Sequence, residues 1–200
     1  LLVGNYAKVE SLTQDVIDNG NFELFADYYN LFKIPGKLCN ESLMEVQVTD
    51  FGSSAGDYIG IDQWFNFMGA SMKGTLPDGS EKSIGGWTFM RFNMNFVQWA
   101  KNRGETIRLK TSVLEGGETY DGFTVNGTDV AYNGKAYLPY EQMTEGNSDW
   151  GHNNNVRLIR YAEVLLMNAE AKVRNGKSGD AEVNLVRSRA NMPALSGATV

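Results

Sequence analysis

The sequence predicts a mainly α fold in which helical hairpins alternate with long loops and short β-strands. In residues 156–190, apolar side chains recur at steps of three and four, and Gly176 interrupts this pattern before a second helical stretch. Residues 6–19 show the same periodicity and end at Gly20. Residues 52–86 contain eight glycines and no helical period, which indicates irregular structure.

The first third of the chain predicts one helix and one strand. The helix covers residues 6–19, and the strand covers residues 42–49, where polar and apolar side chains alternate. In the glycine-rich stretch that follows, Pro77-Asp78-Gly79 is a turn signal.

The middle of the chain predicts a helix over residues 92–102 and a strand over residues 106–114. The helix places Phe96 and Trp99 three residues apart, so we expect both rings in the core. Gly-Gly and Asn-Gly dipeptides mark tight turns around an expected hairpin at residues 123–130; they are Gly116-Gly117, Asn126-Gly127 and Asn133-Gly134.

The last 45 residues predict a helical hairpin that resembles the tetratricopeptide type. Gly176 ends the first helix, and Ser178 or Asp180 caps the second. Two ion pairs are expected on the first helix, Arg160 with Glu163 and Glu170 with Arg174. The packing residues are predicted to be Ala162, Leu165, Leu166 and Ala169 of the first helix against Leu185 and Val186 of the second.

Composition excludes some classes of partner. The 200 residues carry 18 Lys and Arg against 24 Asp and Glu, a net charge of −6, and no clustered basic stripe. Nucleic-acid binding is therefore not expected, because it depends on neutralising phosphates. No apolar run approaches the length of a membrane-spanning helix. Cys39 is the single cysteine, so no intrachain disulfide is possible.

The sequence offers no recognisable catalytic or metal-binding set. His152 is the only histidine and has no second ligand candidate close to it in the sequence. Carboxylates are plentiful, but nothing selects the pair that a glycosidase needs. No glycine-rich nucleotide motif is present. We therefore expect no catalytic residue, no metal and no cofactor.

Aromatic residues in irregular segments are the remaining binding candidates, because flat rings stack on the C–H faces of sugars. Such rings occur in Trp64-Phe65-x-Phe67 and Trp87-x-Phe89, and Trp150 is another. The predicted carbohydrate platform comprises Trp64, Tyr58, Phe65 and Trp87, with Asp62 as a polar partner for hydroxyl groups. The alternative is that these rings pack the loop onto the helices.

Several motifs together resemble the SusD/RagB family. The signature is IRYAEVLLM at residues 159–167, followed by Ala169-Glu170-Ala171 and then by Asn184-x-x-Arg187-x-Arg189-Ala190. Supporting motifs occur in the family's order; they are Val16-Ile17, Gly20, Phe32, ESLMEVQVT at residues 41–49, Gly86-Trp87 and Tyr137-Leu138-Pro139. The last 45 residues carry the distinctive part of this resemblance.

The resemblance implies a non-catalytic glycan-binding lipoprotein at the surface of the outer membrane, active in nutrient uptake. It would pass oligosaccharides or polysaccharides to a SusC-like TonB-dependent transporter. Its tetratricopeptide-like helices would form an α/α superhelix that serves as scaffold. Residues 1–200 would be one SusD-like domain fragment, truncated at both ends and without the lipid anchor. Two alternatives stay open: a tetratricopeptide-type adaptor that binds proteins, and a glycan-active hydrolase.

Overall fold

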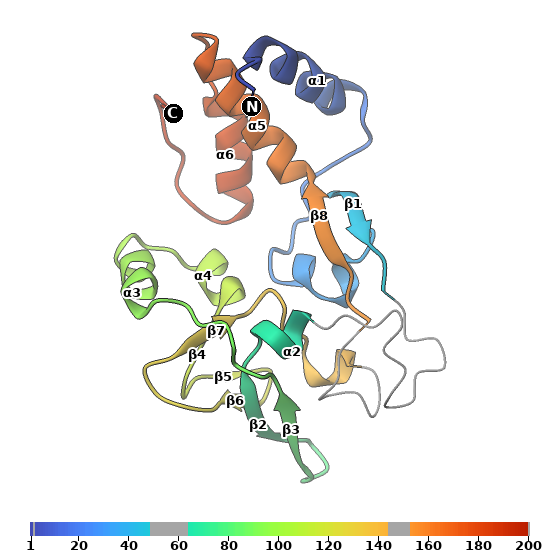
Figure 1. Ribbon diagram of the computed structural model, residues 1–200, viewed down its shortest axis with the longest axis vertical. Coiled ribbons are helices and arrows are strands. Elements are labelled where there is room, and N and C mark those ends of the chain that lie inside the picture. The colour runs from blue at the N-terminus through green and yellow to red at the C-terminus, as the bar shows by residue number, and fades with distance from the viewer. Residues whose placement is uncertain (2, 49–63, 144–152, 200) are drawn as a thin grey trace. The chain divides into compact units, whose positions relative to one another are not determined.

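The computed structural model describes residues 1, 3–48, 64–143 and 153–199, which form two compact units (Figure 1). Unit 1 comprises Leu1–Tyr28, Leu38–Glu45 and Arg157–Val200, and unit 2 comprises Tyr29–Lys37 and Val46–Val156. The described residues contain six α-helices and eight short strands in three sheets. The fold is therefore mixed α/β, and the prediction of a mainly α protein underestimated the strands.

Unit 1 is a helical unit with one two-stranded sheet. Its helices are α1 (Tyr6–Asn19), α5 (Tyr161–Arg174) and α6 (Asp180–Arg189), and α5 contacts both α1 and α6. The predicted hairpin is confirmed, with Gly176 at a φ of +77° in the turn that follows α5. Its first helix begins five residues later than predicted, because residues 156–160 form strand β8 (Val156–Arg160), which pairs with β1 (Ser42–Val46).

The packing of α5 is partly as predicted. Ala162, Leu165 and Ala169 are buried, but Leu166 is 42% exposed and Leu185 of α6 is 54% exposed. The prediction for these two leucines was therefore wrong. Helix α5 also packs against α1, so its buried side is not the one that Leu166 occupies, and Leu185 lies on a side of α6 that faces solvent. Buried Asn168 links those helices, since its amide Nδ2 donates to Thr13 Oγ1 at 2.9 Å.

A buried ion cluster joins the strands of unit 1 to α6. Glu41 is fully buried, and its carboxylate accepts from Arg160 Nη1 at 2.7 Å and from Arg189 Nη1 at 2.5 Å. The backbone N–H of Phe25 also donates to Glu41 Oε2, at 2.8 Å. The predicted Arg160–Glu163 pair is replaced, because Glu163 instead accepts from the backbone N–H of Arg160. The Glu170–Arg174 ion pair is confirmed at 2.8 Å.

Unit 2 is built on a four-stranded antiparallel sheet of order β3-β2-β6-β5, with β4 and β7 paired separately. Its core contains Met72, Ile84, Phe123, Val125 and Tyr137. The strands are β2 (Ser71–Thr75), β3 (Glu81–Gly85), β4 (Val113–Glu115), β5 (Thr119–Tyr120), β6 (Phe123–Val125) and β7 (Ala131–Asn133), and the helices are α2 (Trp64–Met68), α3 (Met94–Asn102) and α4 (Ile107–Ser112). Three short 3-10 helices complete the described elements, at Asn30–Phe32, Ile34–Gly36 and Tyr140–Gln142.

Unit 2 differs from the sequence prediction in two segments, residues 106–114 and the hairpin of β5 and β6. Most of residues 106–114, predicted as a strand, form α4, and the strand β4 begins only at Val113. The hairpin turns at Asp121-Gly122, where φ is +49° and +81°, rather than within residues 123–130. Two consecutive residues with positive φ suit the twist of a two-residue hairpin.

Helix α3 forms where it was predicted, but its exposed side is not the expected one. Val97 and Ala100 are buried, whereas Phe96 is 47% and Trp99 is 53% exposed. The prediction that Phe96 and Trp99 lie in the core was therefore wrong. Helical spacing showed that these rings share a side of the helix, but Val97 and Ala100 occupy the side that faces the core.

Candidate functional site

Three aromatic side chains gather on unit 2, and we call them the Trp87 cluster: Phe67 of α2, Trp87 and Phe89. The ring centroids of Phe67 and Trp87 lie 4.9 Å apart in an edge-on arrangement, and those of Trp87 and Phe89 lie 5.8 Å apart. The third pair, Phe67 and Phe89, is separated by 6.2 Å. Phe67 is 47% and Phe89 is 69% exposed, so the cluster presents aromatic surface to solvent.

The backbone explains why these residues meet. The N–H of Trp87 donates to the carbonyl of Asn66 at 2.6 Å, and the N–H of Gly86 donates to the carbonyl of Ala70 at 3.1 Å. A Cβ atom at Gly86 would lie 2.4 Å from that carbonyl oxygen, so this close approach of two chain segments requires glycine. The Gly86-Trp87 motif therefore places the tryptophan beside α2.

An unusual backbone conformation lies between the two rings of the Trp87-x-Phe89 segment. Thr88 has a φ of +61°, in the left-handed region that a β-branched residue rarely adopts. Its N–H donates to the carbonyl of Gly69 at 3.2 Å, which helps to hold this conformation. Strained residues of this kind concentrate at functional sites.

Of the predicted platform, Trp87 is found in the cluster, half-buried against Phe67 and Phe89. Trp64 and Phe65 belong to the short helix α2, which also carries Phe67. The predicted residues Tyr58 and Asp62 lie outside the described residues, as do Trp150 and His152.

Phe67 and Phe89 were among the aromatic candidates of the sequence analysis, in Trp64-Phe65-x-Phe67 and Trp87-x-Phe89, but were not included in the predicted platform. Their contact across residues 67–89 could not be read from the sequence.

One buried polar side chain lies next to the cluster. Asn66 precedes Phe67 in α2 and is fully buried, and neither its amide nitrogen nor its amide oxygen has a hydrogen-bond partner within the described ranges. Buried side-chain amides usually have hydrogen-bond partners, so the Asn66 amide is an exception. It cannot contact a ligand on the surface directly, because it has no exposed area.

The shifts in pKa of several titratable groups are explained by burial or by local hydrogen bonds. Burial raises the pKa of Tyr137 far above its usual range and also raises the pKa of Tyr120, so both phenols stay protonated. Hydrogen bonds from Ser80 lower the pKa of Asp78, and those from Lys177 and Asn175 lower the pKa of Glu10. Tyr137 and Tyr120 belong to the packing of unit 2, Asp78 lies in a turn and Glu10 lies on α1, so these shifts reflect structural roles.

Neither a metal site nor a membrane-spanning helix occurs in the part of the chain that the structure describes. No group of three or more His, Cys, Asp or Glu side chains there is arranged to hold a metal ion. Among the helices of that same part of the chain, none has the length and apolar character to cross a membrane.

Comparison with solved structures shows which fold this is. A laminarin-binding SusD-like protein has a TM-score of 0.77 at 19% identity, and surface glycan-binding protein A from Bacteroides uniformis has 0.73 at 23% identity. The same protein from Bacteroides thetaiotaomicron, in complex with laminarihexaose, has 0.71 at 21% identity. The matches cover 96–97% of this chain but only 39–45% of those chains, so the 200 residues span less than half of these relatives.

The family model described as the SusD family matches residues 22–200, which is most of the chain. No curated protein sequence matches. The family match agrees with the signature at residues 159–190 and with the fold of the solved structures. The chain therefore belongs to the SusD family.

Proposed function

We propose that this protein is a non-catalytic glycan-binding protein that captures oligosaccharides at the cell surface with the Trp87 cluster. The observation that carries the proposal is the exposed group of Phe67, Trp87 and Phe89 on a SusD-family chain. Rings of this kind offer large contact area at low cost in conformational entropy. The relatives described as binding laminarin and laminarihexaose support a glycan as the ligand.

The predicted neighbours complete this proposed platform. Trp64 and Phe65 would extend the aromatic surface from α2, while Tyr58 and Asp62 would add a further ring and a hydrogen-bonding carboxylate. Trp64→Ala tests this extension, because a member of the platform weakens sugar binding when its ring is removed. Unchanged affinity in a folded Trp64→Ala variant would restrict the site to the Trp87 cluster.

Calorimetric titration of the purified protein with laminarihexaose, cellohexaose and maltohexaose tests the main proposal. Phe89→Ala is the cleanest variant because this side chain is 69% exposed, so its removal leaves the core intact. We expect the affinity for the bound sugar to fall about tenfold. Leu185→Ala is the matched control, since Leu185 is 54% exposed on α6 and should leave the affinity unchanged. Equal affinities for both variants would contradict the proposal.

We propose that the protein is not catalytic, because the sequence has a single histidine and no pattern in it selects a nucleophile and a base. Incubation with the bound oligosaccharide should release no reducing ends, and His152→Ala should leave the affinity unchanged. Release of reducing ends that a carboxylate substitution abolishes would show that the protein is a hydrolase.

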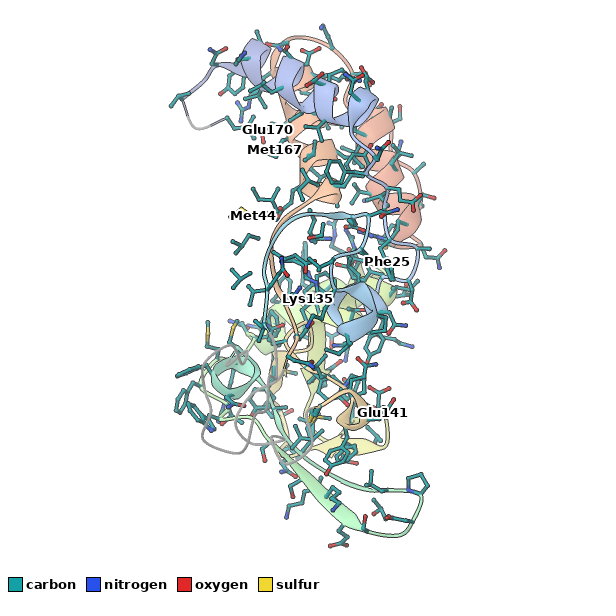
Figure 2. All side chains as sticks on the ribbon, turned by 90° about the vertical axis from the view of Figure 1, so that its right-hand side faces the viewer. Phe25, Met44, Lys135, Glu141, Met167 and Glu170 are labelled. Atoms are coloured by element: carbon teal, nitrogen blue, oxygen red, sulfur yellow. The ribbon has the colours of Figure 1, made fainter. Side chains whose placement is uncertain are left out.

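We further propose delivery of the glycan to a SusC-like TonB-dependent transporter in the outer membrane. Unit 1 offers an exposed surface for a partner, a shallow apolar groove of about 420 Å³ lined by Ile159, Glu163, Leu166, Met167 and Glu170. Figure 2 shows Met167 and Glu170 on the same side of α5. Leu166→Asp should abolish co-purification with the transporter, whereas Leu185→Asp on α6 should not.

The remaining proposal concerns the complete protein. We infer that residues 1–200 are part of a longer lipid-anchored SusD-type chain, because they span 39–45% of the similar structures. In that chain, α5 and α6 would be one hairpin of a tetratricopeptide-like array, in which stacked hairpins bury each other's apolar faces. Mass spectrometry of the protein purified from its native membrane would determine its length and its anchor.

A further inference from the structure

A second group of stacked side chains lies along α3, and we call it the α3 ridge: Phe92, which precedes the helix, Phe96 and Trp99 of α3, and Arg103, which follows its last residue. Ring centroids are 6.1 Å apart for Phe92 and Phe96 and 5.7 Å apart for Phe96 and Trp99, with interplanar angles of 19° and 28°. The guanidinium carbon of Arg103 lies 4.9 Å from the centre of the Trp99 ring. Phe96 and Trp99 are three residues apart in α3 and share one side of the helix, and their contacts with Phe92 and Arg103 extend the row at its two ends.

Core packing does not explain the α3 ridge. Val97 and Ala100 already supply the buried side of α3, at 1% and 3% exposure. Phe96 and Trp99 remain about half exposed, while Phe92 is partly buried and fixes the start of the row. Exposed apolar surface is unfavourable for a free protein and commonly marks a binding surface.

The polar residues beside the α3 ridge suit a neutral, hydroxyl-rich ligand. Asn95, Gln98 and Asn102 occupy the adjoining stripe of the helix, and Gln98 Nε2 donates to Asn102 Oδ1 at 2.9 Å. Residues 94–102 contain no carboxylate. Each amide offers a donor and an acceptor, which is the pattern that neighbouring sugar hydroxyls need. The rings can stack on the C–H faces of the same sugars.

The α3 ridge is also close along the chain to the Trp87 cluster in the same unit. Three peptide steps separate Phe89 from Phe92, so their Cα atoms are at most about 11 Å apart. The two aromatic surfaces are therefore within reach of a single glycan chain of several sugar units. A ligand that occupies both surfaces gains from the high effective concentration of its second segment.

We propose that the α3 ridge is a second saccharide subsite, which binds a further segment of the same neutral polysaccharide that the Trp87 cluster holds. This inference rests on the proposed glycan-binding function. It predicts that the protein binds polysaccharides more tightly than short oligosaccharides, because only a long chain contacts both surfaces.

The test is affinity electrophoresis in gels containing laminarin, hydroxyethyl cellulose or amylopectin, combined with calorimetry using short oligosaccharides of the retarding polymer. Trp99→Ala and Phe96→Ala should each weaken binding of the polymer about tenfold. Their affinity for the trisaccharide of the same polymer should stay within about twofold of the wild-type value. Phe89→Ala should weaken binding of both ligands. Ile107→Ala is the control, because Ile107 is a 37% exposed apolar residue of α4 in the same unit. Circular dichroism checks that every variant is folded.

The outcomes separate the two proposals. If Phe89→Ala weakens binding but folded Trp99→Ala and Phe96→Ala bind the polymer like the wild type, the second subsite is refuted and the Trp87 cluster stands. A change in oligomeric state of Trp99→Ala, seen by sedimentation, would instead assign the α3 ridge to contact between copies and would overturn the inference. If no polymer retards the wild type and none of the oligosaccharides binds, both proposals fail together.

Discussion

Replacing Glu41 by glutamine is the sharpest test of how unit 1 is held together. The fully buried carboxylate of Glu41 lies between Arg160 and Arg189, whose side chains are 17% and 5% exposed. In Glu41→Gln the shape is kept and the amide oxygen can still accept from the N–H of Phe25. The negative charge is lost, however, and the buried guanidinium of Arg189 is left without its counter-ion.

The expected loss of stability follows from this burial. Removing one partner of a buried ion pair costs about 3–5 kcal/mol, and the retained hydrogen bond from Phe25 places Glu41→Gln near the lower end, at about 3 kcal/mol. The matched control is Glu170→Gln, which breaks the Glu170–Arg174 ion pair on the surface of α5. Exposed pairs four residues apart contribute about 0.3–0.5 kcal/mol.

Urea unfolding followed by circular dichroism at a helix-sensitive wavelength measures both variants, because α1, α5 and α6 of unit 1 make up most of the described helix. Equal slopes against urea concentration would show that the midpoints report stability. If the free energies of unfolding of Glu41→Gln and Glu170→Gln differ by less than about 1 kcal/mol, the ion cluster does not stabilise the protein as argued.

Three further predictions concern unit 1. Leu165→Ala should lower the free energy of unfolding by about 2–5 kcal/mol and Leu166→Ala by under about 1 kcal/mol, because only Leu165 is fully buried; equal losses would contradict the packing of α5. Gly176→Ala should lower the free energy of unfolding by about 1–2 kcal/mol, measured in thermal or urea unfolding. A Cβ atom there would contact no neighbour, so the cost comes from the left-handed backbone with φ of +77°, and an unchanged stability would argue against this turn. Hydrogen bonds donated by the backbone N–H groups of Ala198 and Gly197 lower the pKa of the Asp180 carboxyl from its usual value. The stabilising contribution of this carboxylate is therefore present above its unfolded-state pKa and is lost as the pH falls through the lowered folded-state pKa. The Ala198 amide resonance should accordingly titrate at a lower pH than that of an ordinary aspartate and should cease to titrate in Asp180→Asn.

Features that depend on neighbouring residues were predictable from the sequence. The helix at residues 6–19, the helix predicted at residues 92–102 and observed at 94–102, the hairpin of α5 and α6, and the turn at Gly176 follow from helical periodicity and from the conformational freedom of glycine. The SusD-type signature was recognisable for the same reason, because its motif is contiguous in the chain and is now matched by the family model.

Features that depend on distant partners were decided by the tertiary structure. Residues 156–160 form a strand because β1, more than a hundred residues earlier, pairs with them. The motif residues Glu41, Arg160 and Arg189 have a joint role only because folding buries them together, where each charge needs its counter-ion. The sequence showed which residues are aromatic and how they are spaced. Whether a ring is buried or exposed depends on which side of its element meets the core, and that choice requires the packed neighbours.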